Sequence, residues 1–437
     1  MSKLTQSLER ANPVLFTAFA GLAGFAAYFS MYAFRKPFSV AIFTAVPHWH
    51  FELDYKIALV LAQVAGYALS KLMGVKLIAE FQPAKRAGAI LKLIFLSWIA
   101  LILFALVPAP WNVFAMFLNG LPLGMIWGLV FGFMEGRRTS EVLGAILCAS
   151  FIVSSGAVKS VGKLLMDGWH VSPYWMPAAT GLIFFPILAL SVWGLSILPP
   201  PNAADETARV KRAPMNAAAR ASFLSRFGTG VAFLVICYIM VTAIRDFRDN
   251  FAAELWTALG YGKEAAVYTA SEVPVAVLAL TVLGVIIVVR DNVKALMVIH
   301  AVVIAGLLLL GASTLAFHAG YLSPLMWMIL SGAGLYMAYV PFNAMLFDRL
   351  IAVSGTVGTA GFLIYVADAS GYIGSCALLV WRNFGLLQLN WLQVFTAAAY
   401  ATSVLGTVFV ALSAVFFYAK RRGAARAPSD TVAPAIS

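Results

Sequence analysis

Twelve long apolar stretches dominate this sequence. They begin near residues 14, 57, 88, 112, 142, 174, 228, 265, 293, 322, 357 and 391. A transmembrane helix needs about 20 mostly apolar residues, and each stretch is long enough to supply one. The chain is 62% hydrophobic and only 11% charged, so it cannot cover its apolar residues with a water-soluble surface. The sequence therefore predicts an all-α, polytopic membrane protein surrounded by the lipid bilayer.

The positive charges are distributed unevenly between the two sides of the predicted membrane. A net charge of +12 would suit a nucleic-acid partner in a soluble protein, but here most lysines and arginines lie in short loops. If the N-terminus is cytoplasmic, only Lys56, Lys263 and Arg382 fall in the opposite loops. This asymmetry predicts a bacterial inner-membrane protein with both termini cytoplasmic and no nucleic-acid partner. The first stretch is too long for a signal peptide and should remain as the first span.

A long polar segment, residues 199–227, divides the chain. It starts with three prolines, including Pro199, and continues with polar and basic residues. Such a composition is typical of a flexible linker, which we place on the cytoplasmic side. The segment separates residues 1–198 from residues 228–437, so each half holds six predicted spans.

The two halves share a weak repeat in their first spans. At one constant offset, the sequence Tyr-x4-Ala-x-Arg occurs twice, as Tyr28, Ala33 and Arg35 and as Tyr238, Ala243 and Arg245. Parallel repeats of six helices are a feature of major facilitator transporters. We therefore expect that fold, with glycines at helical spacing allowing close packing; these are Gly120, Gly124, Gly128 and Gly132.

Nine basic residues lie in or near the predicted spans. A charge at the bilayer centre costs roughly 2.5–3.5 kcal/mol on insertion scales, so each requires a partner or a function. Three lysines near helix ends can extend to the interface: Lys76, Lys92 and Lys163. The other six are candidate substrate-binding residues: Arg35, Lys36, Lys71, Lys159, Arg245 and Arg248.

Arg35 and Arg245 hold equivalent places in the two halves. We expect both near the inner ends of their helices and facing one cavity, where two guanidinium groups could bind phosphate or carboxylate oxygens. The alternative is that each is paired with a neighbouring acid, as Arg245 would be with Asp246 or Asp249. Lys71 and Lys159 either add positive field to the cavity or form structural pairs.

Four acids in or beside the spans are candidates for proton coupling: Asp246, Asp249, Glu272 and Asp368. Asp368 has apolar flanks, so desolvation favours its protonated form and suits a proton carrier. The alternative is a neutral or cation-paired residue that holds two helices together. Glu272 precedes Pro274, where a kink frees backbone carbonyls.

The remaining candidates are aromatic residues, and most of these should be ordinary packing. They are Tyr28, Tyr32, Tyr67, Trp127, Tyr238, Tyr336 and Tyr365. The segment from His48 to Asp54 clusters histidines and acids, but a solvated external loop explains it better than a metal site. Three cysteines inside apolar stretches indicate neither a disulfide framework nor a zinc site. No cofactor or metal is expected.

Two motifs resemble those of the organophosphate:phosphate antiporters. The sequence Tyr32-Ala-Phe-Arg35-Lys-Pro-Phe38 is similar to that family's Tyr-x-x-Arg-Lys-x-Phe signature, and Gly66-Tyr-Ala-Leu-Ser-Lys71-Leu-Met-Gly74 is similar to its second-span motif. The resemblance implies that Arg35 and Lys71 line an anion cavity and that Arg245 matches the family's seventh-span arginine. The loop after the second span and the fifth span, which lacks the family's histidine, depart from the pattern.

These observations predict a monomeric secondary transporter of a small organic anion that works by alternating access. The anion is either a phosphate ester exchanged for phosphate or a polycarboxylate, such as a siderophore, carried with protons. No nucleophile, metal cluster or catalytic loop is evident, so a membrane enzyme is not favoured. A receptor or channel is a further alternative, but two six-span halves with a linker favour a rocking carrier.

Overall fold

The computed structural model describes residues 3–79, 83–135, 137–201, 205, 217–354, 361–385 and 389–426. Regular secondary structure in this part of the chain is entirely helical, and eleven of its helices are long and apolar enough to cross a membrane. Helix α16 (Gly361–Phe384) is a twelfth long helix, and at 24 residues it extends roughly 36 Å, enough for a bilayer core. The predicted fold class is thus confirmed.

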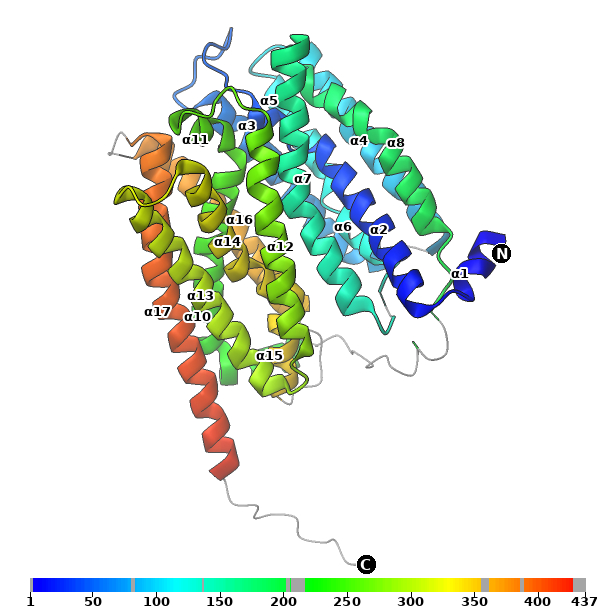
Figure 1. Cartoon of the computed structure of the whole chain (residues 1–437), viewed down its shortest axis with the longest axis vertical. Helices are drawn as coiled ribbons and strands as arrows, with labels where there is room; N and C mark the ends of the chain where they lie inside the picture. Colours follow the sequence, from blue (N-terminus) through cyan, green and yellow to red (C-terminus); the bar gives the residue numbers. More distant parts are fainter. Residues whose placement is uncertain are drawn as a thin grey trace, which may run out of the picture.

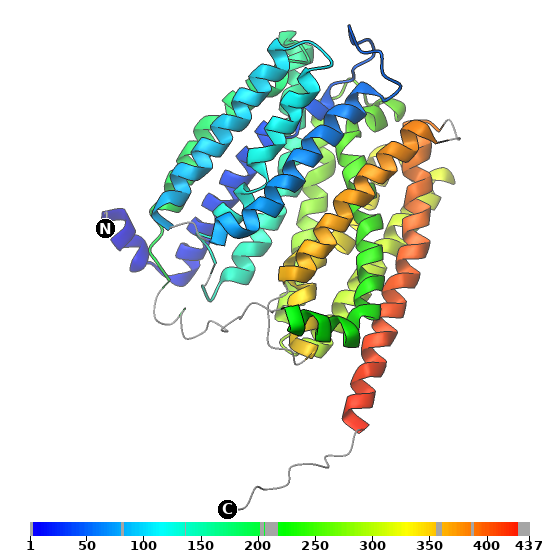
Figure 2. The same ribbon diagram turned by 180° about the vertical axis from the view of Figure 1, so that it is seen from behind.

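The helices form two bundles that lie side by side (Figures 1 and 2). The N-terminal bundle contains α2 (Pro13–Met31), α3 (Tyr55–Ala79), α4 (Arg86–Leu106), α5 (Asn112–Leu123), α6 (Ile126–Phe131), α7 (Ser140–Trp169) and α8 (Met176–Ser196). The C-terminal bundle contains α10 (Ala217–Asn250), α12 (Ala266–Val288), α13 (Asn292–His318), α14 (Pro324–Pro341), α15 (Phe347–Ser354), α16 and α17 (Trp391–Arg426). Shorter helical segments are α1 (Lys3–Glu9), η1 (Tyr32–Phe34), η2 (Pro37–Val40), η3 (Pro83–Lys85), α11 (Ala252–Ala258) and η4 (Phe342–Leu346).

The predicted span starts agree closely with these bounds. Ten of the twelve fall within two residues of a helix start. The seventh differs, because α10 begins at Ala217 and so contains residues 217–227 of the predicted linker. Residues 202–204 and 206–216 of that linker, and residues 355–360 before α16, lie outside the described residues.

Local sequence explains where several helices start. Asn12 accepts a hydrogen bond from the Val14 amide at 2.9 Å and precedes a proline at the first helical position of α2. Ser323 caps α14 in the same way, again before a proline. Asp291 accepts from the Lys294 amide at 2.7 Å and caps α13. Short polar residues before the apolar stretches therefore fix the starts of these three helices.

Glycine allows the closest helix contacts. A Cβ at Gly66 on α3 would overlap the carbonyl oxygen of Phe117 on α5, so these two backbones touch. Between the halves, a Cβ at Gly156 on α7 would overlap the carbonyl oxygen of Tyr268 on α12 and lie 2.9 Å from Cγ of Glu272. The α7–α12 contact between the bundles therefore depends on a glycine.

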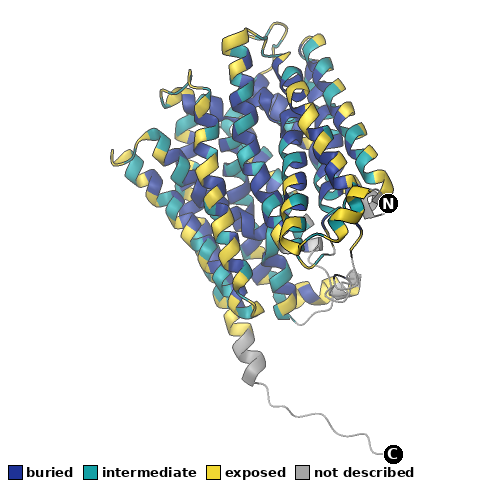
Figure 3. Ribbon diagram, turned by 45° about the vertical axis from the view of Figure 1, so that its right-hand side comes forward, coloured by how far each residue is buried: buried dark blue, intermediate teal, exposed yellow. Residues whose placement is uncertain are grey.

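The two ends of the molecule can be distinguished. Helix α1, the start of α2 and the last turns of α17 lie at one end, which we call the terminal end (Figure 1). Residues 41–54 and α11 lie at the opposite end, the loop end. Between the ends, buried residues fill the interior and exposed residues cover the outer faces (Figure 3). Leu22, Leu190 and Val415 are among the exposed apolar side chains, as expected for helices that face lipid.

Candidate substrate site

The predicted arginines lie towards the loop end. Arg35 follows η1, and Arg245 lies five residues before the end of α10. Because α2 and α10 both start at the terminal end, residues near their last turns approach the loop end. The prediction that the two arginines lie near the inner ends of their helices was therefore wrong, given cytoplasmic termini.

Arg35 lies among tyrosines without an acidic partner. Its guanidinium carbon lies 3.8 Å from the centroid of the Tyr67 ring and 5.9 Å from that of Tyr32. Tyr28 and Tyr372 also interact with it electrostatically. Among the described residues, no carboxylate forms an ion pair with Arg35, and its buried Nε lacks a hydrogen-bond partner. A half-buried guanidinium group without an acidic partner is suited to bind an anion.

A buried polar network holds the backbone at Arg35. The change from α-helix to η1 leaves backbone carbonyls free of the α-helical pattern. Asn119 donates to the carbonyl of Phe34 at 2.9 Å, and Gln63 donates to the carbonyl of Arg35 at 2.9 Å and to Asn119 Oδ1 at 2.7 Å. Ser97 Oγ accepts from Asn119 at 2.7 Å. Three helices thus fix the point from which the Arg35 side chain extends.

Asp249 joins the two bundles through two lysines. Lys159 Nζ lies 2.5 Å from Asp249 Oδ1, and Lys36 pairs with Oδ2. Lys36 also donates to Asn250 Oδ1 at 2.9 Å, and Ser155 donates to Asp249. Two buried lysines share one carboxylate here, so this cluster retains one positive charge.

Arg245 is paired within its own half, as the alternative hypothesis held. Its Nη2 lies 2.5 Å from Asp246 Oδ1, and its guanidinium carbon lies 3.9 Å from the Tyr339 ring centroid. Ser375 on α16 donates to Asp246 Oδ2 at 2.7 Å. Each repeat arginine therefore lies over a tyrosine ring, but only Arg245 has a carboxylate beside it.

Arg248 and Glu272 form a second pair inside the C-terminal bundle. Nη1 of Arg248 lies 2.7 Å from Glu272 Oε1, and Nη2 donates to the Met328 carbonyl at 3.0 Å. Because Arg248 is only 4% exposed and has these partners, its observed contacts are structural.

Lys71 and Asp368 form another ion pair between the two bundles. Lys71 Nζ on α3 lies 2.7 Å from Asp368 Oδ2 on α16, and Tyr238 donates to Asp368 Oδ1 at 2.7 Å. Asn343 in turn donates to the Tyr238 hydroxyl at 3.2 Å. The Lys71 side chain is 27% exposed, whereas Lys36 and Lys159 are almost fully buried. Lys71 is therefore the interbundle cation that a ligand can reach most easily.

The aromatic candidates divide into two groups. Tyr32 and Tyr67 surround Arg35, and Tyr238 holds Asp368. Trp127 instead stacks on Phe131 of α6, with ring centroids 5.0 Å apart, which is ordinary packing. The side chain of Tyr365 lies outside the described residues.

Sequence reasoning missed one interbundle pair. Lys56, counted as an external loop charge, is 3% exposed and contacts Glu254 at 2.6 Å and the Ser39 carbonyl at 2.6 Å. Burial raises the pKa of the Glu254 carboxyl above its usual value, although the Lys56 ammonium opposes that shift. Both residues flank apolar stretches, so nothing in the sequence distinguished them from solvated charges.

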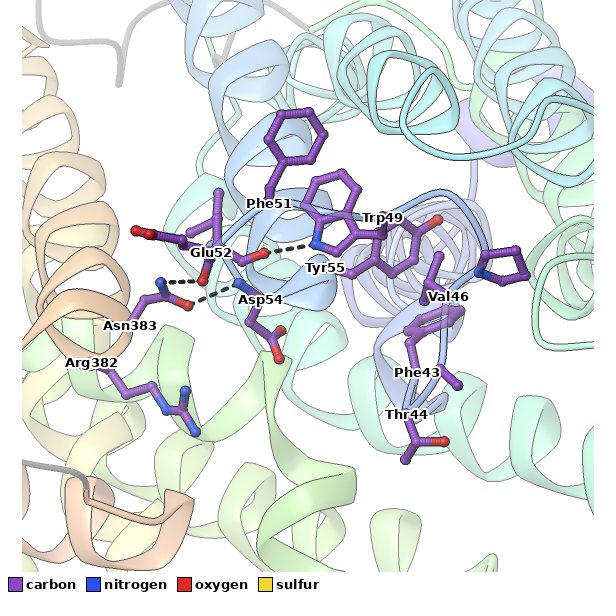
Figure 4. Close-up of a pocket in the computed structure, with 13 residues that line it drawn as sticks. Phe43, Thr44, Val46, Trp49, Phe51, Glu52, Asp54, Tyr55, Arg382 and Asn383 are labelled. Carbon is purple, nitrogen blue, oxygen red and sulfur yellow. Dashed lines mark hydrogen bonds between the residues drawn. The ribbon is translucent and has the colours of Figure 1, made fainter.

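The segment around His48, predicted from the sequence to lie in an external loop, borders a pocket at the loop end. Figure 4 shows this pocket, which has a volume of about 750 Å³ and is lined by residues 43–47, Trp49, residues 51–55, Arg382 and Asn383. Asn383 accepts from the Asp54 amide at 2.9 Å and donates to the Glu52 carbonyl at 3.1 Å. These bonds join the two bundles at the loop end. The loop end is thus closed by polar contacts, while the bundle ribbons diverge towards the terminal end (Figure 2).

The predicted charged residues leave an excess of positive charge. Three pairs are neutral, namely Arg245 with Asp246, Arg248 with Glu272, and Lys71 with Asp368. Arg35 contributes one uncompensated charge, and the Lys36–Asp249–Lys159 cluster contributes another. The interior between the bundles therefore carries a field that attracts anions.

Comparisons with known proteins show the fold. A bacterial homologue of the human drug peptide transporters PepT1 and PepT2 aligns with a TM-score of 0.61 at 14% identity, covering 93% of this chain and 98% of its own. The nucleoside transporter NupG gives 0.59 at 15% identity (91% and 98%), and a D-xylose-proton symporter gives 0.54 at 14% identity (92% and 96%). No curated protein matches the sequence. The resemblance to the organophosphate:phosphate antiporters is not confirmed by these comparisons.

A family model also matches the sequence itself, over residues 37–420. This range includes most of the chain and every candidate site residue except Tyr28, Tyr32, Arg35 and Lys36. The fold is that of the major facilitator transporters, and by sequence the chain belongs to the family of unknown function DUF5690.

Proposed function

We propose that this protein is a secondary transporter that carries a small organic anion across a bacterial inner membrane by alternating access. The Arg35 guanidinium, which has no carboxylate partner among the described residues, is the observation that carries this proposal. A half-buried cation without a counter-ion is costly, so its presence between two bundles suits a ligand that supplies the missing negative charge. The uncompensated charge on the Lys36–Asp249–Lys159 cluster adds to the same attraction.

The contacts between the bundles support a carrier that changes conformation. Ion pairs at Asp249 and Lys56, and the hydrogen bonds of Asn383, close the loop end. The side chains that make these contacts are polar, so water can solvate them when the bundles separate. With cytoplasmic termini, this conformation would be closed to the outside, and its opening would admit substrate from there.

Proton-coupled uptake of a polycarboxylate is favoured over phosphate exchange by one observation. Asp368 contacts Lys71 across the bundle interface, and Lys71 is partly accessible. An anion that binds Lys71 would take the counter-ion of Asp368, so ligand binding and the charge of Asp368 are coupled at this place. Exchange of phosphate for its esters needs no such group.

Purified protein in liposomes would test the proposal. We expect uptake of at least one compound from a labelled panel of phosphate esters, hydroxy acids and ferric siderophores. Arg35→Lys should strongly lower that uptake at low substrate concentration, whereas Arg10→Lys, at an exposed position of the terminal end, should not. Wild-type uptake of none of these anions, with correctly folded protein, would refute the organic-anion proposal.

A further inference from the structure

The repeat places unlike residues beside its two arginines. The offset that matches Arg35 with Arg245 also matches Lys36 with Asp246. One half thus has Arg-Lys where the other has Arg-Asp. Two halves related by a repeat would otherwise present similar charges to the interface, so this difference concerns the charge of the site.

In the structure, Asp246 contacts its neighbouring arginine, whereas Lys36 does not. Asp246 Oδ1 lies 2.5 Å from Arg245 Nη2, the contact that a ligand carboxylate would make with a free arginine. The corresponding Lys36 turns to Asp249 and Asn250, which leaves Arg35 without a carboxylate. Both side chains of the Arg245–Asp246 pair remain partly exposed, at 17% and 13%.

We propose that Asp246 is an internal counter-anion that occupies Arg245 and thereby sets the charge of the substrate. With Asp246 in place, the site has an excess of two positive charges and takes a ligand with two negative charges. A third negative charge on the ligand would need Arg245, which is already paired with Asp246. This inference rests on the proposed transport of an organic anion and specifies the charge class of that substrate.

The surroundings of Asp246 hold it in this position. Ser375 donates to its second oxygen at 2.7 Å, so the carboxylate is fixed from α16 as well as from Arg245. Asparagine has the same shape, and its oxygen can accept from Arg245 while its amide nitrogen donates to the Ser375 hydroxyl, so Asp246→Asn removes the charge with little disturbance of packing.

Equilibrium binding of two charge series to the purified protein would test this inference. Butyrate, glutarate and tricarballylate carry one, two and three carboxylates on a three-carbon backbone. Glycerol 3-phosphate and 3-phosphoglycerate differ by one carboxylate. At a pH where these groups are ionised, we expect the wild-type protein to prefer glutarate or glycerol 3-phosphate within its series.

Asp246→Asn should shift the preference by one charge. We expect the affinity for the more highly charged member to rise about 10- to 100-fold relative to the less charged one, the range for one charge-assisted hydrogen bond. Asp246→Glu keeps the charge and should keep the wild-type preference. Asp167→Asn makes the same change of net charge at a pair with Lys163 near the loop end, outside the site, and should leave the preference unchanged.

The outcomes separate the two proposals. Binding of neither series by the wild-type protein would contradict the organic-anion function itself. Binding with an unchanged charge preference in Asp246→Asn, or an equal shift in Asp167→Asn, would overturn the role of Asp246 and leave the transport proposal intact.

Discussion

Asp249→Asn should open the loop end. Asp249 is the only carboxylate recorded, within the described part of the chain, in ion pairs with Lys36 and Lys159. The side chains of these lysines are 6% and 4% exposed. Without the charge of Asp249, two buried ammonium groups would lie close together with no counter-ion while the loop end stays closed.

The size of the effect follows from the cost of an uncompensated buried charge. Removing one partner of a buried ion pair costs about 3–5 kcal/mol. Separation of the bundles exposes both lysines to water and relieves that cost, so the free energy appears as a shift of conformation. At about 1.4 kcal/mol for each factor of ten, the equilibrium ratio of loop-end-open to loop-end-closed molecules should rise about 100- to several-thousand-fold.

Double electron–electron resonance between spin labels at the loop end would measure this shift. Trp111 and Tyr321 lie on opposite bundles and are 74% and 84% exposed, so cysteines there can be labelled. A Cys376→Ser background suffices, since Cys148 and Cys237 are buried. We expect a longer distance to become dominant in Asp249→Asn.

Asp167→Asn is the matched control. It breaks an exposed loop-end pair with Lys163 and should leave the distance distribution unchanged, because such pairs contribute about 0–1 kcal/mol. An Asp249→Asn distribution identical to that of the wild type would refute the reasoning, and it would mean that the remaining contacts alone hold the loop end closed.

Four further predictions concern single residues. Arg35→Lys should weaken substrate affinity about 10- to 100-fold in a binding assay, because a charge-assisted hydrogen bond is lost. Arg245→Lys should weaken the affinity less, because Asp246 already neutralises Arg245. Equal losses of affinity would contradict this ranking. Asp368→Asn should abolish accumulation driven by a pH gradient in liposomes but preserve substrate exchange, and surviving gradient-driven accumulation excludes it as the obligatory proton carrier. Gly156→Leu should favour the loop-end-open state in the same distance measurement, since its side chain would collide with α12. Asn119→Ala should lower the unfolding free energy by about 1–3 kcal/mol through an unsatisfied buried carbonyl, and an unchanged melting temperature in detergent would disprove that role.

The spans could be predicted because each is a local property of the chain. Asn12, Ser323 and Asp291 lie immediately before helices that the apolar stretches had already placed. The start of α10 was missed because residues 217–227 are polar but helical, and polarity alone does not end a helix.

The site could be predicted only in part. Charges inside apolar stretches drew attention to six cations and four acids, because a charge in a bilayer is costly wherever it lies, and their roles in substrate binding and proton coupling stay predictions. Asn119 and Gln63 carried a weaker signal, as uncharged polar residues in apolar spans. Lys56 and Glu254 carried none, since they flank apolar stretches as solvated loop charges also do.

The sequence by itself determined that the chain crosses a membrane, because hydrophobicity is read along the chain, and it predicted a repeat of the two halves from the spacing of three residues. Only the tertiary structure decided which charges neutralise one another. Lys71 and Asp368 are 297 residues apart, and Lys56 and Glu254 are 198 apart. Whether such residues meet depends on how each helix is rotated and which bundles touch. That is why Arg35 and Arg245, at matching places in the sequence, differ in the structure: Arg245 is paired with Asp246, whereas Arg35 has no carboxylate partner among the described residues.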